Sequence, residues 1–379
     1  MRLGIAGLGA VAQAVYLPLL ARHPERFRVT AVADLSPVLV AAIGDRLGLP
    51  RSARFESAED LLTSGDIDAV LLLASGSHGA LAMVALSMGL SVLCEKPLAW
   101  TLAEADGMAA VPDATARLLL GYMKLHDPAV ERAMELARRR PPLRSLEVTV
   151  LHPTAGAQLA HAALLLPEEV AEEKLRALEA QADALRERAL GPAAGALGRL
   201  YSDVLLGSVV HDLAVMRVLA GEPEAIDHVD AWPHDGGTGR GLPASLAIAG
   251  RLAEGARFSI RWHFLPAYPA YREEVRLHDE AGTIELAFPS PYLLHAPTEL
   301  SLVEPAGAAS ARTRFRSTEE AFERQLLTFH AFWRGEGRPR AGIAEGRADI
   351  ATCLRIALVL ARERRLDIGG EAAVLGDAA

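Results

Sequence analysis

The sequence predicts an α/β protein with two domains, a doubly wound parallel sheet followed by an α/β domain with a large, mainly antiparallel sheet. Short β-rich runs alternate with helical patterns through the first 120 residues, as in parallel sheets with crossover helices. A glycine-rich turn separates the first of these runs from the first helical pattern. After residue 121, strand-like runs follow one another without helices between them, which favours antiparallel pairing.

The N-terminal domain is expected to cover residues 1–121. Its strands are predicted at 2–6, 28–33, 69–74, 91–94 and 117–120, and its helices at 10–23, 37–47, 79–88 and 101–110. Pro18 falls inside the first helix, where proline removes a hydrogen-bond donor and clashes with the preceding turn. We therefore expect a kink or a split in that helix.

The C-terminal domain is expected to cover residues 122–379. Strands are predicted at 144–152, 225–231, 245–253, 257–264, 272–278 and 283–287, with helices at 128–139, 319–334 and 344–364. Glycine-rich turns join the strands, which is typical of a largely antiparallel sheet. The last helix closes the chain.

A helical insertion is predicted at about residues 157–200. Pro167 opens its main helix and Gly191-Pro192 closes it, with no glycine or proline between them. Leu175, Leu178 and Leu185 recur at helical spacing. Such a helix packs on its own subunit, covers the active site as a lid, or contacts another subunit, and the sequence leaves these three readings open.

Composition and charge narrow the classes of partner. Half of the residues are apolar (51%), and acidic and basic side chains are mixed along the chain with a net charge of -9. Because no basic stripe is present, nucleic acid is not an expected partner. Residues 69–94 carry no charged side chain, but glycines at 76, 79 and 89 interrupt the run, so a strand, turn, helix and strand explain it better than a membrane span.

Cysteine usage points to a reducing compartment. Cys94 and Cys353 are the two cysteines, and they lie far apart in apolar segments. They form neither a disulfide framework nor a metal site, so we expect a cytoplasmic protein without bound metal.

The segment Gly7-Leu8-Gly9-Ala10-Val11-Ala12 follows a strand and opens a helix, which is the G-x-G-x-x-A pattern of a Rossmann dinucleotide site. The first glycine permits a tight turn, the second lets the backbone approach a pyrophosphate, and the small last residue lets helix and strand pack closely. The helix start then presents free N–H groups to the phosphates. Gly7, Gly9, Ala10 and Val11 are the predicted contacts.

Asp34 ends the second strand, about 25 residues after Gly9, where Rossmann domains place the acid that binds ribose. A carboxylate there accepts hydrogen bonds from both ribose hydroxyls and repels a 2′-phosphate. The expected cofactor is NAD, with NADP less favoured.

Glu95-Lys96-Pro97 directly follows a buried strand, at the carboxyl edge where doubly wound sheets bind ligands. A lysine at this edge can polarise a reacting oxygen or hold the cofactor ribose, whereas the alternative is an ordinary surface ion pair. This Glu-Lys-Pro signature resembles the Gfo/Idh/MocA family, the group of glucose–fructose oxidoreductase and inositol dehydrogenase. The block from Gly121 to Pro128 and the block His211-Asp212-Leu213 with its following Arg-Val-Leu-Ala-Gly run are similar to further motifs of that family.

The resemblance implies an NAD(P)-dependent enzyme that transfers hydride between nicotinamide and an alcohol or ketone of a sugar, sugar derivative or inositol. It implies a homodimer or homotetramer formed through the C-terminal sheet. Lys96 and His211 would be the catalytic residues, with His211 as general base. Further cofactor contacts would come from Ser75, His78, Glu95 and Lys96, and substrate contacts from Lys96, Tyr122, His126 and His211.

One departure from the family pattern concerns His211. The family usually places an aspartate one helical turn before this histidine, and here that position is Gly207. Asp203, eight residues before His211, would lie about 12 Å from it along a helix, outside hydrogen-bond reach. Two other functions therefore stay open: NAD-assisted elimination or hydrolysis of a glycoside without net redox change, and an NAD(P)-binding regulator that has lost catalysis.

Overall fold

The computed structural model describes residues 1–167, 169–233 and 244–377, and the chain divides into two units. The first unit comprises Met1–Tyr122, Ala162–Ala189 and Gln325–Ile350, and the second comprises Met123–His161, Leu190–Arg324 and Ala351–Ala379. The first division falls one residue beyond the boundary drawn from the sequence. The other two segments of the first unit lie in the range that the sequence assigns to the C-terminal domain.

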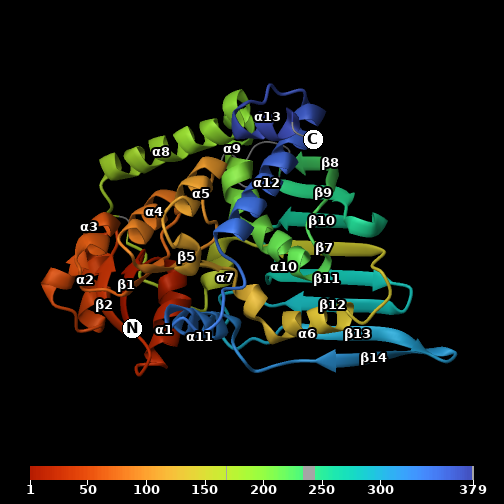
Figure 1. The fold of residues 1–379 in the computed structure, drawn as a ribbon, viewed down its shortest axis with the longest axis horizontal. Coiled ribbons are helices and arrows are strands. Elements are labelled where there is room, and N and C mark those ends of the chain that lie inside the picture. The colour runs from red at the N-terminus through yellow and green to blue at the C-terminus, as the bar shows by residue number, and fades with distance from the viewer. Residues whose placement is uncertain (168, 234–243, 378–379) are drawn as a thin grey trace. The chain divides into compact units, whose positions relative to one another are not determined.

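The first unit contains a six-stranded parallel sheet with the order β3-β2-β1-β4-β5-β6. Figure 1 labels β1, β2 and β5 of this sheet. Its strands are β1 (Arg2–Ala6), β2 (Arg28–Ala33), β3 (Arg54–Phe55), β4 (Ala69–Leu72), β5 (Ser91–Glu95) and β6 (Leu118–Gly121). The strand order reverses between β1 and β4, and ligands of such sheets bind beyond the carboxyl ends of the strands at this point. The two-residue strand β3 is too short to show a periodic pattern, and it was not predicted.

The helices of this unit follow the predicted pattern with one local break. They are η1 (Ala12–Tyr16), α1 (Leu17–Ala21), α2 (Pro37–Arg46), α3 (Ala58–Thr63), α4 (Gly79–Ser87) and α5 (Leu102–Ala109). The first helix changes from π to α geometry at Leu17, so that Pro18 lies in the first turn of α1, where its missing donor costs little. The expected interruption at Pro18 is therefore present. The short helix α3 was not predicted.

The second unit contains an eight-stranded sheet with the order β14-β13-β12-β11-β7-β10-β9-β8. Its strands are β7 (Ser145–His152), β8 (Ala225–Trp232), β9 (Ser245–Arg251), β10 (Arg257–Phe264), β11 (Arg272–Asp279), β12 (Gly282–Phe288), β13 (Glu299–Ala306) and β14 (Ala309–Phe315). All pairings are antiparallel except that of β7 with β10. The predicted fold class is confirmed.

The two strands that the sequence missed, β13 and β14, lie at the edge of this sheet. Every residue of β14 except the last is exposed, so the strand has no alternation of apolar and polar positions from which it could be predicted. It is held instead by its ladder to β13. Helices α6 (Pro128–Ala137) and α10 (Val210–Ala220) cover one face of the sheet, α6 against β12 and β13 and α10 against β7.

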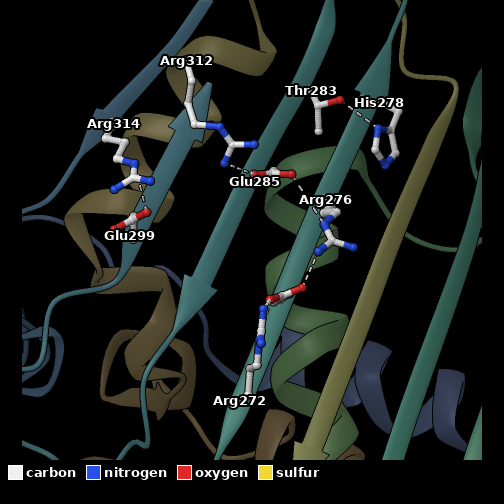
Figure 2. A network of polar contacts seen from close by, with 9 residues as sticks. Arg272, Arg276, His278, Thr283, Glu285, Glu299, Arg312 and Arg314 are labelled. Carbon is white, nitrogen blue, oxygen red and sulfur yellow. Dashed lines mark hydrogen bonds and ion pairs between the residues drawn. The ribbon is translucent and has the colours of Figure 1, made fainter. Parts of the chain in front are cut away.

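The opposite face of the sheet carries a ladder of ion pairs that crosses β11 to β14 (Figure 2). Arg276 lies between Glu274 on its own strand and Glu285 on β12, at 2.5 and 3.7 Å. Arg312 on β14 reaches Glu285 at 2.9 Å. Arg314 pairs with Glu299 at 3.5 Å. On β11 to β14, each of these arginines thus faces a glutamate on its own or another strand.

The remaining helices of the chain are short or lie in the insertion and the C-terminal region. They are η4 (Met123–His126), α7 (Ala155–Leu159), α8 (Glu172–Leu190), α9 (Ala194–Arg199), η6 (Leu200–Val209), α11 (Ala321–Trp333), α12 (Ile343–Arg364) and α13 (Gly370–Asp377). Short 3₁₀ turns complete the set: η2 (Arg51–Ala53), η3 (Ala114–Ala116), η5 (Gly191–Ala193) and η7 (Ala253–Gly255). No helix within the described ranges combines the length and apolar composition that crossing a bilayer requires.

Helix α8 is the main helix predicted for the insertion. It begins at Glu172 rather than at 167, and residue 168 of the predicted range lies outside the described residues. Arg186 anchors it: the guanidinium is bound by Glu179 at 3.0 Å and Asp183 at 2.8 Å, and it lies 5.2 Å from the ring centroid of Trp100. Up to Ala189, α8 therefore packs on its own unit of the chain.

Candidate active site

The glycine-rich turn after β1 has the geometry that a bound pyrophosphate needs. Gly7 has φ of +98°, and a Cβ there would lie 2.4 Å from the backbone nitrogen of Ala74, so a side chain has neither the conformation nor the space. A Cβ on Gly9, by contrast, would meet no atom within 4 Å. Ala10 and Val11 follow at the start of the helix, whose first N–H groups have no acceptor within the helix. The turn therefore leaves open space at a cluster of donors, and a dinucleotide fits it.

Asp34 lies at the carboxyl end of β2 and braces this turn. One carboxylate oxygen accepts the backbone N–H of Leu8 at 2.7 Å, and the other accepts that of Ser36 at 2.9 Å. Each carboxylate oxygen has a further lone pair, so these two bonds leave acceptor capacity for ribose hydroxyls. Asp34 can thus shape the turn and bind a ribose at the same time.

Glu95, at the end of β5, holds the backbone beside Lys96. Its carboxylate accepts the hydroxyl of Tyr16 at 2.6 Å and the backbone N–H of Lys96 at 3.2 Å, and Gln325 in turn donates to the Tyr16 hydroxyl at 2.9 Å. Burial raises the pKa of Glu95 and, together with the neighbouring carboxylate, that of Tyr16. Tyr16 and Gln325 could not be predicted as site residues, because nothing in the local sequence pattern relates residues so far apart.

His78 joins the loop after β4 to the loop after β5. Its Nδ1 lies 2.7 Å from the carbonyl oxygen of Pro97, and its Nε2 lies 2.8 Å from that of Ala74. Burial lowers the pKa of His78, and a neutral ring donates to one of these carbonyls. Ser75 is exposed in the same loop. The first unit thus brings Ser75, His78, Glu95 and Lys96 together in two adjoining loops.

His211 belongs to the second unit and is the second residue of α10, half-buried. The preceding segment η6 is a π-helix, in which the backbone is wider than in an α-helix. A Cβ on Gly207 would lie 3.3 Å from the carbonyl oxygen of Ser202, which is tight for any side chain. Asp203 accepts the Ser202 hydroxyl at 2.5 Å and is exposed.

Asp212, the residue after His211, belongs to a buried ionic cluster that was not predicted from the sequence. Glu273 accepts the ammonium of Lys124 and, at 2.5 Å, the hydroxyl of Tyr271. Burial and the neighbouring Glu273 raise the pKa of Asp212 well above its usual range. One signal was available: Glu273 shares the inward alternation of Val275 on β11, a polar residue at a core position.

The two remaining predicted substrate contacts lie in different units. Tyr122 is buried in the first unit, and its hydroxyl donates to Asp349 at 2.6 Å. His126 ends η4 in the second unit and is buried as well. Burial of both side chains means that neither ring presents a broad surface to solvent.

Sequence comparisons with known proteins find similarity mainly in the N-terminal part of the chain. Residues 1–121 match the family model described as "Oxidoreductase family, NAD-binding Rossmann fold" (GFO_IDH_MocA). The D-xylose 1-dehydrogenase (NADP(+)) 2 of Haloferax volcanii is 35% identical over 141 residues, 36% of this chain and 41% of that protein. An inositol 2-dehydrogenase of Burkholderia multivorans is 30% identical over 152 residues, 38% of this chain and 44% of that protein. The chain thus spans about two-fifths of the length of these curated relatives.

The likeness in fold extends further than the likeness in sequence. A levoglucosan dehydrogenase solved in complex with NADH has a TM-score of 0.70 at 16% identity, covering 96% of this chain and 97% of that one. This comparison shows the shared fold across both units. The motif-based resemblance is confirmed for residues 1–121, which match the NAD-binding Rossmann domain of the Gfo/Idh/MocA oxidoreductase family.

Proposed function

We propose that the protein is an NAD-dependent oxidoreductase that transfers hydride between nicotinamide and the carbinol or ketone carbon of a sugar, sugar derivative or inositol. The observation that carries this proposal is the pairing of an open glycine turn at Gly7 and Gly9 with a lysine, Lys96, whose backbone is held at the carboxyl end of β5. The names of the relatives, xylose and inositol dehydrogenases, support a polyhydroxylated substrate.

The proposed site residues have distinct roles in this reaction. The helix N–H groups at Ala10 and Val11 would hold the pyrophosphate, and Asp34 would hold the ribose; bound nicotinamide supplies the hydride chemistry. Lys96 donates a hydrogen bond to the reacting oxygen and stabilises developing alkoxide charge. His211 exchanges the hydroxyl proton through its imidazole.

The loop contacts explain how Lys96 is aimed. Glu95 accepts its backbone N–H, and His78 bonds to the carbonyl of Pro97 on its other side. Because both partners are buried, the loop is fixed on each side of the lysine. We propose that Glu95 and His78 serve the cofactor site mainly by positioning this loop. Ser75 would contact the cofactor directly from the loop after β4.

NAD is the proposed cofactor in preference to NADP. Asp34 supports this because a 2′-phosphate would meet its carboxylate at close range. Asp34→Ala is expected to weaken NAD binding, and Asp34→Ser combined with Leu35→Arg is expected to shift preference toward NADP. Titration of the unmodified protein with each dinucleotide checks this; tighter binding of NADP would overturn the assignment of Asp34.

We also propose a cytoplasmic homodimer or homotetramer assembled through the C-terminal sheet. The residues of β10 that alternate with its buried ones form a face with which a second copy can pack, and the ion pairs of Figure 2 on β11 to β14 support the assembly because a second copy would meet charges that are already paired. Both cysteines are buried thiols, which suits a reducing compartment. Light scattering at micromolar concentration tests the assembly, and a monomer would refute it.

A panel of sugars, inositols and nucleotide sugars, each with NAD, tests the main proposal. Formation of reduced nicotinamide, followed by its absorbance, is the expected result for at least one substrate. Product formed without reduced nicotinamide would instead indicate redox-neutral elimination or hydrolysis. Tight NAD binding with no turnover of any substrate would indicate a binding protein.

A further inference from the structure

The insertion brings a second carboxylate to the loop that follows β2. Glu169 accepts the hydroxyl of Ser36 at 2.5 Å and the backbone N–H of Val38 at 3.3 Å. Ser36 is the N-cap of α2 and also accepts the backbone N–H of Leu39 at 3.0 Å. The Glu169 carboxylate therefore lies at the N-terminus of α2, whose N-cap Ser36 is two residues after Asp34.

The segment that carries Glu169 is tied to the glycine-rich turn as well. We call residues 162–167 and 169–171 the strap. The side-chain amide of Gln13 donates to the carbonyl of Leu165 and accepts its backbone N–H, each at 2.9 Å, and it also donates to the carbonyl of Leu8 at 2.8 Å. Beyond the strap, Lys174 pairs with Glu56 at 3.2 Å. These contacts hold the strap along the side of the sheet where β1 and β2 end.

The donors that Glu169 occupies are those that a phosphate on the ribose would need. Helix N-termini and hydroxyl N-caps bind phosphate oxygens well, because N–H groups point outward there and the helix dipole favours negative charge. At α2, the Ser36 hydroxyl and the Val38 N–H already serve a carboxylate of the chain. The Ser36 hydrogen bond also lowers the pKa of Glu169, so the carboxylate is charged at neutral pH.

Ser36 is thus flanked by two acids. Its backbone N–H bonds to Asp34 and its hydroxyl bonds to Glu169. A ribose with free hydroxyls can donate to Asp34 and leave Glu169 undisturbed. A ribose 2′-phosphate would face two carboxylates and would find the local donors taken, and such repulsive elements are an effective way to exclude a competing ligand.

We propose that Glu169 is a second specificity-determining residue of the dinucleotide site, which excludes a 2′-phosphate by occupying the N-terminus of α2. This inference rests on the proposed function, because it requires that a dinucleotide binds at the turn after β1. It assigns the strap a role in ligand choice, in addition to its packing on the first unit.

Calorimetric titration of the full chain with NAD, NADP, 5′-AMP and adenosine 2′,5′-bisphosphate tests the proposal. The variants are Glu169→Gln, which removes the charge, and Glu169→Lys, which reverses it. Glu172→Gln and Glu172→Lys are matched controls, since Glu172 is an exposed residue of α8 whose ion pair, to Arg176, lies within the same helix. Thermal melting of each variant verifies that the fold is intact.

In E169Q, affinity for NADP and for the bisphosphate is expected to rise about tenfold, with NAD and 5′-AMP changed by no more than about twofold, because only the 2′-phosphate meets Glu169. E169K is expected to raise the affinity for NADP and the bisphosphate further. The Glu172 controls are expected to leave all four affinities unchanged. If the wild type binds NAD but both Glu169 variants keep its NADP-to-NAD affinity ratio, Glu169 has no part in specificity and the proposed function stands. If the wild type binds neither dinucleotide, both proposals fall.

Discussion

Replacing Glu273 with glutamine is expected to destabilise the second unit by about 3–5 kcal/mol, because it leaves the ammonium of Lys124 buried without an anion. The Lys124 side chain is 6% exposed and that of Glu273 is 0% exposed, so water cannot replace the lost charge. Because the pKa of Asp212 is raised partly by Glu273, removing the Glu273 charge favours ionisation of Asp212, which softens this loss toward the lower end of the range. Asp212→Asn is the matched control, since it removes the ionisable carboxyl beside Glu273 and keeps a side chain of similar size.

The control has a pH signature of its own. The pKa of Asp212 is raised in the folded protein, so between the usual aspartate pKa and the raised value the native state holds a proton that the unfolded chain releases. The contribution of Asp212 to the stability of the wild type therefore falls as pH rises through this window. Asp212→Asn removes that dependence, so relative to the wild type this variant becomes more stable with rising pH, and at its least favourable pH it stays within about 1 kcal/mol of the wild type.

Urea denaturation at pH 5 and pH 8, followed by tryptophan fluorescence, measures both effects. The expected order of stability at pH 8 is Asp212→Asn at or above the wild type, with Glu273→Gln well below. Equal losses in the two variants, or a larger loss in Asp212→Asn, would show that Asp212 carries the charge that balances Lys124. The reasoning from the cluster geometry would then be wrong.

Three further results are expected. His211→Ala is expected to reduce turnover by about 10²–10⁴-fold with NAD affinity nearly intact, whereas Lys96→Ala is expected to abolish most turnover and to weaken NAD binding as well. Steady-state rates and NAD titration distinguish these two effects. If His211→Ala turns over substrate at the wild-type rate, that histidine is structural. Tyr16→Phe removes a donor from the buried Glu95 and is expected to cost about 1–3 kcal/mol in urea denaturation; no change would mean that Glu95 is satisfied without it. Gly7→Ala is expected to abolish NAD binding and lower the melting temperature, because the backbone there has φ of +98° and no space for a Cβ.

Much of the fold could be predicted from the sequence because it depends on neighbours along the chain. The bounds of β1 and β2 match the predicted ranges residue for residue. The glycine turn and the break at Pro18 follow from backbone conformations that glycine and proline allow or forbid. The same local logic identified Asp34 and Lys96 as candidate site residues, since each directly follows a strand of the parallel sheet.

Tertiary structure decided what depends on residues that are distant in sequence. The exposed strand β14 exists because β13 offers it a ladder, and its own side chains contain no apolar alternation. Glu169 lies 133 positions from Ser36, and Lys124 lies 149 positions from Glu273. Whether a charged residue is a solvated surface group or the partner of a buried one depends on which segments the fold brings together. The sequence by itself therefore determined the Rossmann turn and its cofactor class, while only the folded chain could show the carboxylate at α2 and the burial that raises the pKa of Asp212.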